Sequence, residues 1–147
     1  MALTTQPLVN PIFPGSGSSS SSGTPLEGTP KTHRTSVTTV APGIFTDLDA
    51  LQISSGLTGR LCGLVISATV SLQGTVHTVS DGVASGPLLD LLQWNGSTLM
   101  LEFKDTRFFT ISESAAVGID TFRVTVQNCD NNASGDIFVT FLWEEVS

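Results

Sequence analysis

The sequence contains little charge, and little of that charge is positive. Only 13% of its 147 residues are charged, and six Lys and Arg stand against thirteen Asp and Glu, for a net charge of −7. Nucleic-acid binding draws most of its affinity from neutralised phosphates, so a chain without a basic cluster is a poor candidate for it. The same shortage argues against an anionic membrane surface, and no apolar stretch approaches the ~20 residues of a membrane span. We therefore expect no nucleic acid and no membrane among its partners.

Tyrosine is absent, and cysteine and histidine occur only twice each. Cys62, Cys129, His33 and His77 are too few and too scattered for a structural zinc site, so we expect no metal and no cofactor. The two cysteines are interpreted as buried free thiols, with a disulfide between neighbouring strands as the alternative.

Catalytic signatures are missing as well. The motifs of P-loop proteins, dinucleotide-binding folds and zinc proteases do not occur. A serine-histidine-acid arrangement would have to combine His77 with Asp81, but within an extended segment these residues lie more than ~12 Å apart. Asp47 and Asp49, two residues apart, would point in different directions on a helix. We therefore expect that the protein is not an enzyme.

Serine and threonine take the place of the missing charges. An uncharged polar surface costs less to desolvate than a charged one when another chain covers it, which favours a subunit of a larger assembly. The first residues, MALTTQPLVN, show neither the basic region nor the continuous apolar region of a secretory signal, so we expect none.

Residues 1–33 differ in composition from the rest and are predicted to form an extended N-terminal arm. Prolines recur from Pro7 to Pro30, which excludes a helix because proline fixes φ and lacks a backbone donor. The Gly-Ser run from Gly15 to Gly23 is typical of a flexible spacer and could span ~30 Å. A cluster of four apolar side chains lies before it, too small to form a core: Leu8, Val9, Ile12 and Phe13.

Alone in water, this apolar cluster is expected to be disordered. Laid in a groove or along a sheet edge of another subunit, it would bury its side chains while its backbone pairs. The cluster is therefore predicted to bind a partner. A terminal tail without a role and a linker added by engineering are the alternatives.

Residues 34–147 are predicted to form one β domain. The clearest strand runs from Arg60 to Leu72, where apolar and small polar side chains alternate with a period of two. Seven or eight such strands, joined by short glycine-rich turns, predict an all-β fold, an antiparallel β-sandwich or jelly roll. A parallel α/β fold is excluded because no segment is long enough for crossover helices.

Several local features are predicted within this domain. The first strand is expected over residues 34–41, and one short helix over Asp47–Gln52, with Thr46 as its N-cap. Asn95-Gly96 is the preferred pair for a two-residue turn, so the flanking segments are expected to form a hairpin. Residues 88–92 could instead form a helical turn, because leucine clusters occur in both structures.

The segment Asp130–Ile137 overlaps the first positions of a calcium-binding loop. The twelfth position of that motif should be a glutamate, but it is Phe141, and the segment continues into a strand. A hairpin turn is therefore favoured, with weak calcium binding as the alternative. The strand that follows carries apolar residues on both sides, which predicts that both of its faces are covered.

The preferred hypothesis for function is a structural virion protein of the decoration or cement type. Its partners would be major capsid or other shell subunits, and a homo-oligomer, guessed to be a trimer, is expected. An inward-facing coat protein normally needs a basic arm, so the outer surface of the virion or the joints between subunits are the expected location. The predicted fold resembles that of small virion β-sandwich proteins, and the resemblance is at the level of fold alone.

The alternative is a carbohydrate-binding β-sandwich module or an adhesin-like subunit. Such a module would need an aromatic platform for the sugar. Trp94 and Trp143 are the only tryptophans, tyrosine is absent, and the eight phenylalanines mostly fall where a core would need them.

Overall fold

A computed structural model describes residues 28–94, 98–103, 109–112 and 119–147. The described residues form ten β-strands and no helix. The strands, in chain order, are β1 Thr29–Val40, β2 Phe45–Asp49, β3 Thr58–Ala68, β4 Leu72–Ser80, β5 Val83–Ala84, β6 Leu89–Trp94, β7 Thr98–Glu102, β8 Thr110–Ser112, β9 Thr121–Asn128 and β10 Gly135–Val146.

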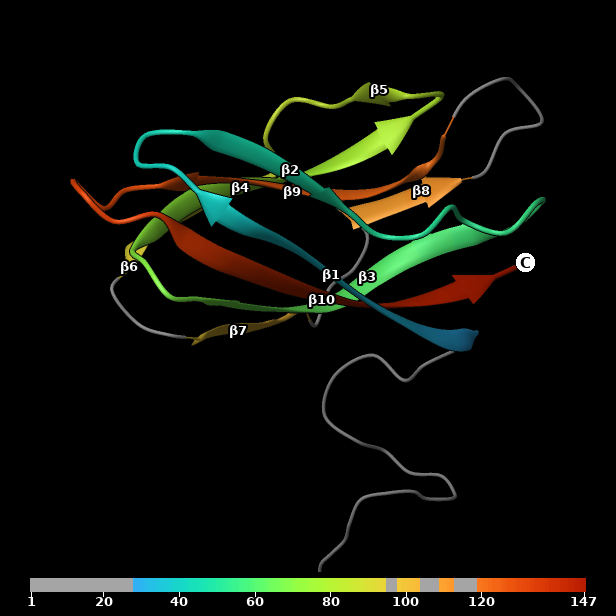
Figure 1. The fold of residues 1–147 in the computed structure, drawn as a ribbon. Helices are drawn as coiled ribbons and strands as arrows, with labels where there is room; N and C mark the ends of the chain where they lie inside the picture. Colours follow the sequence, from blue (N-terminus) through green and yellow to red (C-terminus); the bar gives the residue numbers. More distant parts are fainter. Residues whose placement is uncertain (1–27, 95–97, 104–108, 113–118) are drawn as a thin grey trace, which may run out of the picture.

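The strands form two antiparallel sheets that face each other across one core (Figure 1). Sheet A has the order β1-β10-β3-β7, with β8 also paired to β3. Sheet B has the order β2-β9-β4-β5, with β6 also paired to β4. This arrangement confirms the all-β antiparallel sandwich that the alternating pattern predicts.

The period-two pattern sends one side of each strand into the core. On β3, Leu64 and Ile66 are fully buried, while the alternating Val65 and Ser67 face outward and are half-buried. The core combines inward-facing side chains of both sheets, and its largest fully buried members include Phe122, Phe141, Ile53, Leu61, Leu64, Ile66, Leu72 and Ile137.

The helix predicted over Asp47–Gln52 is wrong, because Phe45–Asp49 forms strand β2 at the edge of sheet B. Leu48 faces the core with 4% of its surface exposed, whereas the aspartates on either side face outward. Their carboxylates bind Arg123 and Thr125 of β9. Cross-strand partners that are distant in sequence therefore bind the two carboxylates that the helix prediction placed in a first helical turn.

The hairpin predicted around Asn95-Gly96 is also wrong. The segment before the turn is strand β6 rather than a helical turn, and it pairs with β4 in sheet B. The segment after it, β7, pairs with β3 in sheet A. Leu91 packs on the core from one sheet, and Leu99 and Leu101 pack on it from the other. Asn95 and Gly96 themselves lie outside the described residues.

Two further strand boundaries differ from the prediction. The strand expected from Arg60 to Leu72 ends at Ala68, where the chain crosses from sheet A to sheet B, although Val70 and Leu72 keep the buried positions of the pattern. The first strand begins at Thr29, earlier than expected, because it pairs with the whole length of β10.

Asp81 and Gly82 form a two-residue turn between β4 and β5. Both residues have positive φ, 52° and 80°, and Ser80 pairs directly with Val83. This is the turn geometry whose twist matches antiparallel strands.

Candidate binding surfaces

The predicted partner-binding residues Leu8, Val9, Ile12 and Phe13 lie outside the described residues. The structure does describe the point where the arm joins the sandwich, at the start of β1. This point lies at the same end of the molecule as the C-terminus (Figure 1), since Thr29 pairs with Glu145.

Two consecutive buried carboxylates hold the start of β1. The backbone N–H of Gly28 donates to Glu144 Oε2 at 3.1 Å, and Lys31 Nζ lies 3.8 Å from Glu145 Oε1. Glu144 also faces Arg60, with 3.6 Å between Nη1 and Oε1. The glutamates are 2% and 4% exposed. Because buried carboxylates need such partners, they fix where the arm leaves the body.

Glu145 has several further hydrogen bonds. It accepts hydrogen bonds from Ser54 Oγ at 2.6 Å and from Ser54 N at 3.2 Å, and another from Trp143 Nε1 at 3.3 Å. Burial raises the pKa of Glu145, but these bonds and the charge of Lys31 outweigh it, and the pKa lies below its usual value. The side chain is therefore ionised at neutral pH.

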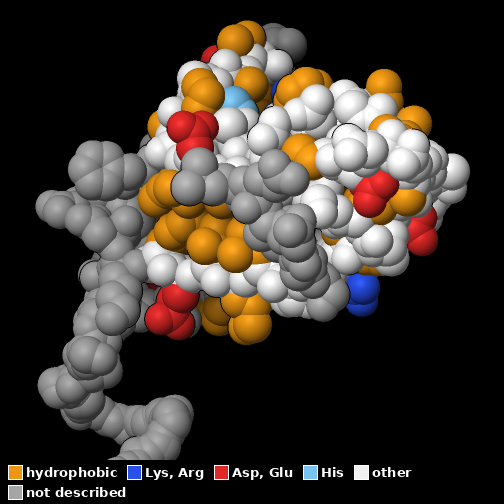
Figure 2. Space-filling view, turned by 90° about the vertical axis from the view of Figure 1, so that its left-hand side faces the viewer, with side chains coloured by type: hydrophobic (Ala, Val, Ile, Leu, Met, Phe, Trp, Pro, Cys, Tyr) orange, Lys and Arg blue, Asp and Glu red, His pale blue; other side chains and the backbone are white. Residues whose placement is uncertain are grey.

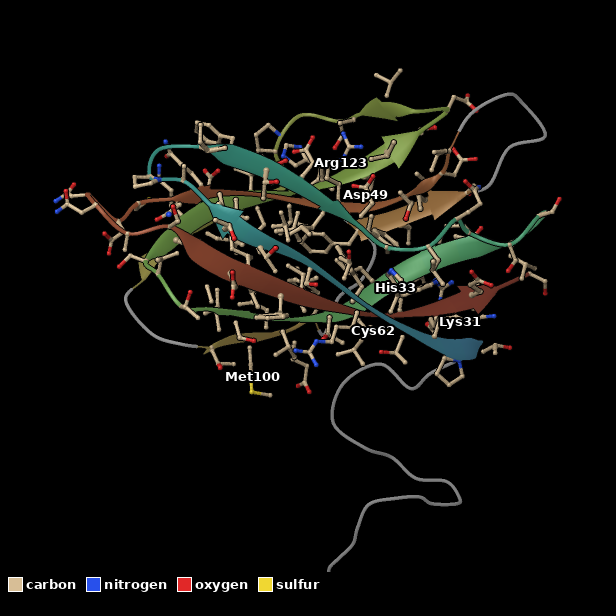
Figure 3. All side chains as sticks on the ribbon, in the orientation of Figure 1. Lys31, His33, Asp49, Cys62, Met100 and Arg123 are labelled. Atoms are coloured by element: carbon tan, nitrogen blue, oxygen red, sulfur yellow. The ribbon has the colours of Figure 1, made fainter. Side chains whose placement is uncertain are left out.

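The outer face of sheet A carries an apolar patch, which we call the sheet A patch. Its members are Val65, Met100, Phe138 and Leu142. The register places Val65 directly opposite Met100, with Phe138 and Leu142 on the same side of β10. Met100 is 73% exposed and Leu142 39% exposed. Figure 3 shows Met100 pointing away from the sandwich.

The prediction that β10 is covered on both faces is therefore wrong for the described part of the chain. Phe138 is half-buried because the guanidinium of Arg34 lies 4.9 Å from its ring centre, a cation–π contact. No second layer of described residues lies on this face. The apolar residues that suggested coverage mark an open surface instead.

The outer face of sheet B is polar by contrast. Arg123 binds Asp49 through two parallel bonds, Nε to Oδ1 at 2.7 Å and Nη2 to Oδ2 at 2.9 Å, and it lies 3.5 Å from Asp47 Oδ2. Thr125 Oγ1 donates to Asp47 Oδ1 at 2.7 Å. Asp49 and Arg123 face each other from β2 and β9 (Figure 3). The two aspartates thus form one charge network with Arg123.

The polar face continues across β4. Gln73 Nε2 donates to Gln127 Oε1 at 2.6 Å. The ring of His77 bonds to Thr75 Oγ1 at 2.6 Å and to the backbone carbonyl of Ser85 at 2.9 Å. His77 is therefore a strand residue with structural partners, in agreement with its extended position.

Among the side chains that the structure describes, few aromatic ones are available as a platform for sugars. Trp143 is 2% exposed, and Phe122 and Phe141 are fully buried. Phe45, at the edge of sheet B, is 63% exposed. The side chain of Trp94 is not among those that the structure describes.

The turn after β9 is stabilised by hydrogen bonds to the side chain of Asp130, a residue of the same turn. Asp130 Oδ1 accepts from the backbone N–H groups of Asn132 and Ala133 at 2.9 and 2.8 Å, which lower the pKa of this carboxyl. The turn is not a hairpin, because β9 lies in sheet B and β10 in sheet A. Within the described ranges, no group of three His, Cys, Asp or Glu side chains is arranged to hold a metal ion.

Both cysteines are free thiols, as the simpler interpretation predicted, but they are half-buried and not fully buried. Cys62 lies on β3 beside Glu144, and burial raises the pKa of its thiol. In the described part of the chain, no helix is long and apolar enough to cross a membrane.

Sequence reasoning missed the carboxylate pair of Glu144 and Glu145 and the exposed Met100. The position of two adjacent glutamates at the end of an apolar strand was a usable signal. Side chains on such a strand are often buried, and a buried carboxylate needs a partner. Met100 carried no signal, since its exposure depends on which sheet β7 joins.

Comparison with known proteins gives no family assignment. No protein family and no curated protein matches the chain. A solved structure titled "CBM4 structure and function" has a TM-score of 0.33 and 14% identity, over 77% of this chain and 80% of that one. A structure of infectious bursal disease virus, Gt strain, has a TM-score of 0.31 and 13% identity, over 92% of this chain and 43% of that one. The chain thus spans less than half of the viral protein.

Proposed function

We propose that the protein is a structural virion subunit of the decoration or cement type, which binds neighbouring shell subunits through its arm and its sheet surfaces. The observation that carries the proposal is the fixed junction at Gly28 and Lys31, where buried Glu144 and Glu145 fasten the chain. An uncharged apolar segment connected to a rigid body at a defined point can link that body to a neighbour.

The surface of the body supports this proposal. The sheet A patch presents apolar side chains in a surrounding of threonine and serine, such as Thr140 and Ser67. Figure 2 shows few and widely separated charged side chains on the face that it draws. A surface of this kind loses little charge solvation when another protein covers it.

In this function the protein acts by linking subunits. Binding to the assembled shell but not to its separated subunits stabilises the shell by mass action, and two contacts on one molecule raise the effective affinity. The proposed partners are major capsid or other shell subunits, and the proposed location is the outer surface or the joints between subunits. We propose a homotrimer, because decoration proteins often occupy threefold positions.

The test replaces the four residues of the arm's apolar cluster with serine in the full chain, at Leu8, Val9, Ile12 and Phe13. Each buried apolar side chain contributes about 1.5–3 kcal/mol, so binding to particles from the native source is expected to weaken at least about 100-fold. Binding is measured by co-sedimentation with these particles.

The control is a variant with serine at Ala2, Thr4 and Thr5, which leaves the apolar cluster intact and should bind as the unaltered chain does. Deletion of residues 1–24 should act like the cluster variant, and both should unfold at the same denaturant concentration as the full chain. Unchanged co-sedimentation of the cluster variant and the truncated chain would contradict the proposal.

A carbohydrate-binding module is the second candidate, and the polar face of sheet B favours it. Gln73, Gln127, Asp47 and Arg123 present donors and acceptors on the outer face of sheet B, and the exposed ring of Phe45 lies at the edge of this sheet. Glycan-array binding that disappears with Phe45→Ala, Gln127→Ala or Trp94→Ala, but persists with Val83→Ala on the short strand β5, would favour this candidate. An array without any binding would remove it.

A further inference from the structure

We propose that the arm of one copy docks on the sheet A patch of a second copy, with Leu8–Phe13 covering Val65, Met100, Phe138 and Leu142. The inference rests on the proposed function and names a partner for the arm. The occupant is thus a segment of this same chain, supplied in trans.

The patch has the size and chemistry to receive such a segment. Its four apolar side chains lie on three adjacent strands, β10, β3 and β7, whose register brings them to one face. Thr140 and Ser67 separate them, the register places Glu102 at the margin, and the guanidinium of Arg34 lies over the ring of Phe138. A chain laid across this face would bury Met100 and Leu142 without covering an unpaired charge in the middle.

The arm matches the patch in charge. Residues 1–26 contain no charged side chain, and Glu27 is the first along the chain. Four of their apolar side chains fall within the six residues from Leu8 to Phe13. An apolar uncharged segment gains more by covering an apolar surface such as the sheet A patch than by covering the charged network of sheet B.

The direction of β1 favours docking in trans. The patch lies beside Thr32 to Ser36, in the first half of β1, and the chain before Thr29 leads away from these residues. The bond from Gly28 to Glu144 fixes the chain there. A chain that continues in the direction of the strand moves away from its own patch and toward a neighbouring molecule.

The length of the arm is sufficient. Fourteen residues separate Phe13 from Gly28, and at ~3.3 Å per extended residue the fifteen steps from one to the other span ~50 Å. The patch crosses three strands spaced ~4.8 Å apart, so a short apolar segment can cover it. Copies related by a closed symmetry could exchange arms mutually, and each exchanged arm would add a second contact.

The first experiment places a photoreactive benzoylphenylalanine at position 13 of the full chain and mixes 15N-labelled with unlabelled copies. Irradiation is expected to join position 13 to peptides containing Met100 or Leu142, and the joined peptides should combine labelled with unlabelled copies. Links within one copy only, links to other parts of the chain, or no links would each overturn the inference. The same probe at position 45, on the other sheet, is the control and should not reach these peptides.

The second experiment measures self-association by sedimentation equilibrium. Met100→Glu and Leu142→Glu are expected to weaken it at least about tenfold, because a charge enters the contact. Val83→Glu, on the exposed strand β5, is the matched control and should change nothing. Matching denaturant midpoints show that each variant is folded.

These outcomes separate the inference from the proposed function. If the patch variants self-associate like the unaltered chain while the arm variant no longer binds particles from the native source, self-docking is wrong and the shell proposal stands. If the arm variant still binds particles from the native source while the patch variants lose self-association, the shell proposal is wrong and the self-docking proposal stands.

Discussion

Glu145→Ala is expected to lower the free energy of unfolding by about 3 kcal/mol, one of the two largest effects predicted for this protein. The substitution removes the acceptor of Ser54 N, Ser54 Oγ and Trp143 Nε1 at a site that is 4% exposed. Each buried donor left without a partner costs about 1–3 kcal/mol. The contact with Lys31 adds little, because that side chain is 42% exposed.

The measurement is urea unfolding at neutral pH. Glu102→Ala, on the outward side of β7, is the control and should change stability by less than about 0.5 kcal/mol. Equal stability of Glu145→Ala and the unaltered protein would show that these hydrogen bonds do not support the folded state.

Glu145 also predicts how stability depends on pH. Its folded-state pKa lies below the ordinary value of 4.5, so its contribution is present above that pH and is lost as the pH falls through the folded value. The unaltered protein should therefore lose more stability than Glu145→Gln between about pH 5 and pH 3. The remaining acids are common to both proteins, so the difference isolates this group. Parallel pH profiles would contradict the assignment.

Asn128→Ala is expected to have a comparable effect, about 3 kcal/mol. Asn128 is fully buried at the end of β9. Its Nδ2 donates to the carbonyls of Val40 and Ala133, both at 2.9 Å, and its Oδ1 accepts from Asp130 N at 2.8 Å. One side chain therefore fastens the end of β1, the turn after β9 and the entry to β10.

Two variants test this role by denaturant unfolding. Asn128→Asp keeps the shape but turns an oxygen toward two carbonyls, so it should be at least as destabilising as alanine at neutral pH. Asn131→Ala, exposed in the same turn, is the control and should be nearly neutral. A neutral Asn128→Asp would show that the two carbonyls do not depend on the amide.

Local pattern predicted the fold class but not the partners of the strands. The alternation in β3 predicted that one side of this strand is buried, and the structure places Leu64 and Ile66 in the core. The same alternation could not show that β6 and β7 belong to different sheets. A turn signal such as Asn95-Gly96 reports a local change of direction, whereas pairing depends on contacts between residues far apart in sequence.

The candidate surfaces follow the same division. Asp47 and Asp49 were predicted as the first turn of a helix, because acidic residues after a threonine fit that position. Their real partner, Arg123, is more than seventy residues away in the chain. In the same way, the apolar residues of β10 indicated a covered strand, although one of its faces is open and bears Phe138 and Leu142.

The sequence by itself determined that the body is an all-β sandwich, because side-chain alternation and turn residues act over neighbouring positions. It also determined the low charge and the uncharged apolar arm, which are matters of composition. The tertiary structure decided which strands pair, where Glu144 and Glu145 hold the start of β1, and which face of sheet A stays open. These features arise from contacts between distant segments, whose free energy no local pattern contains.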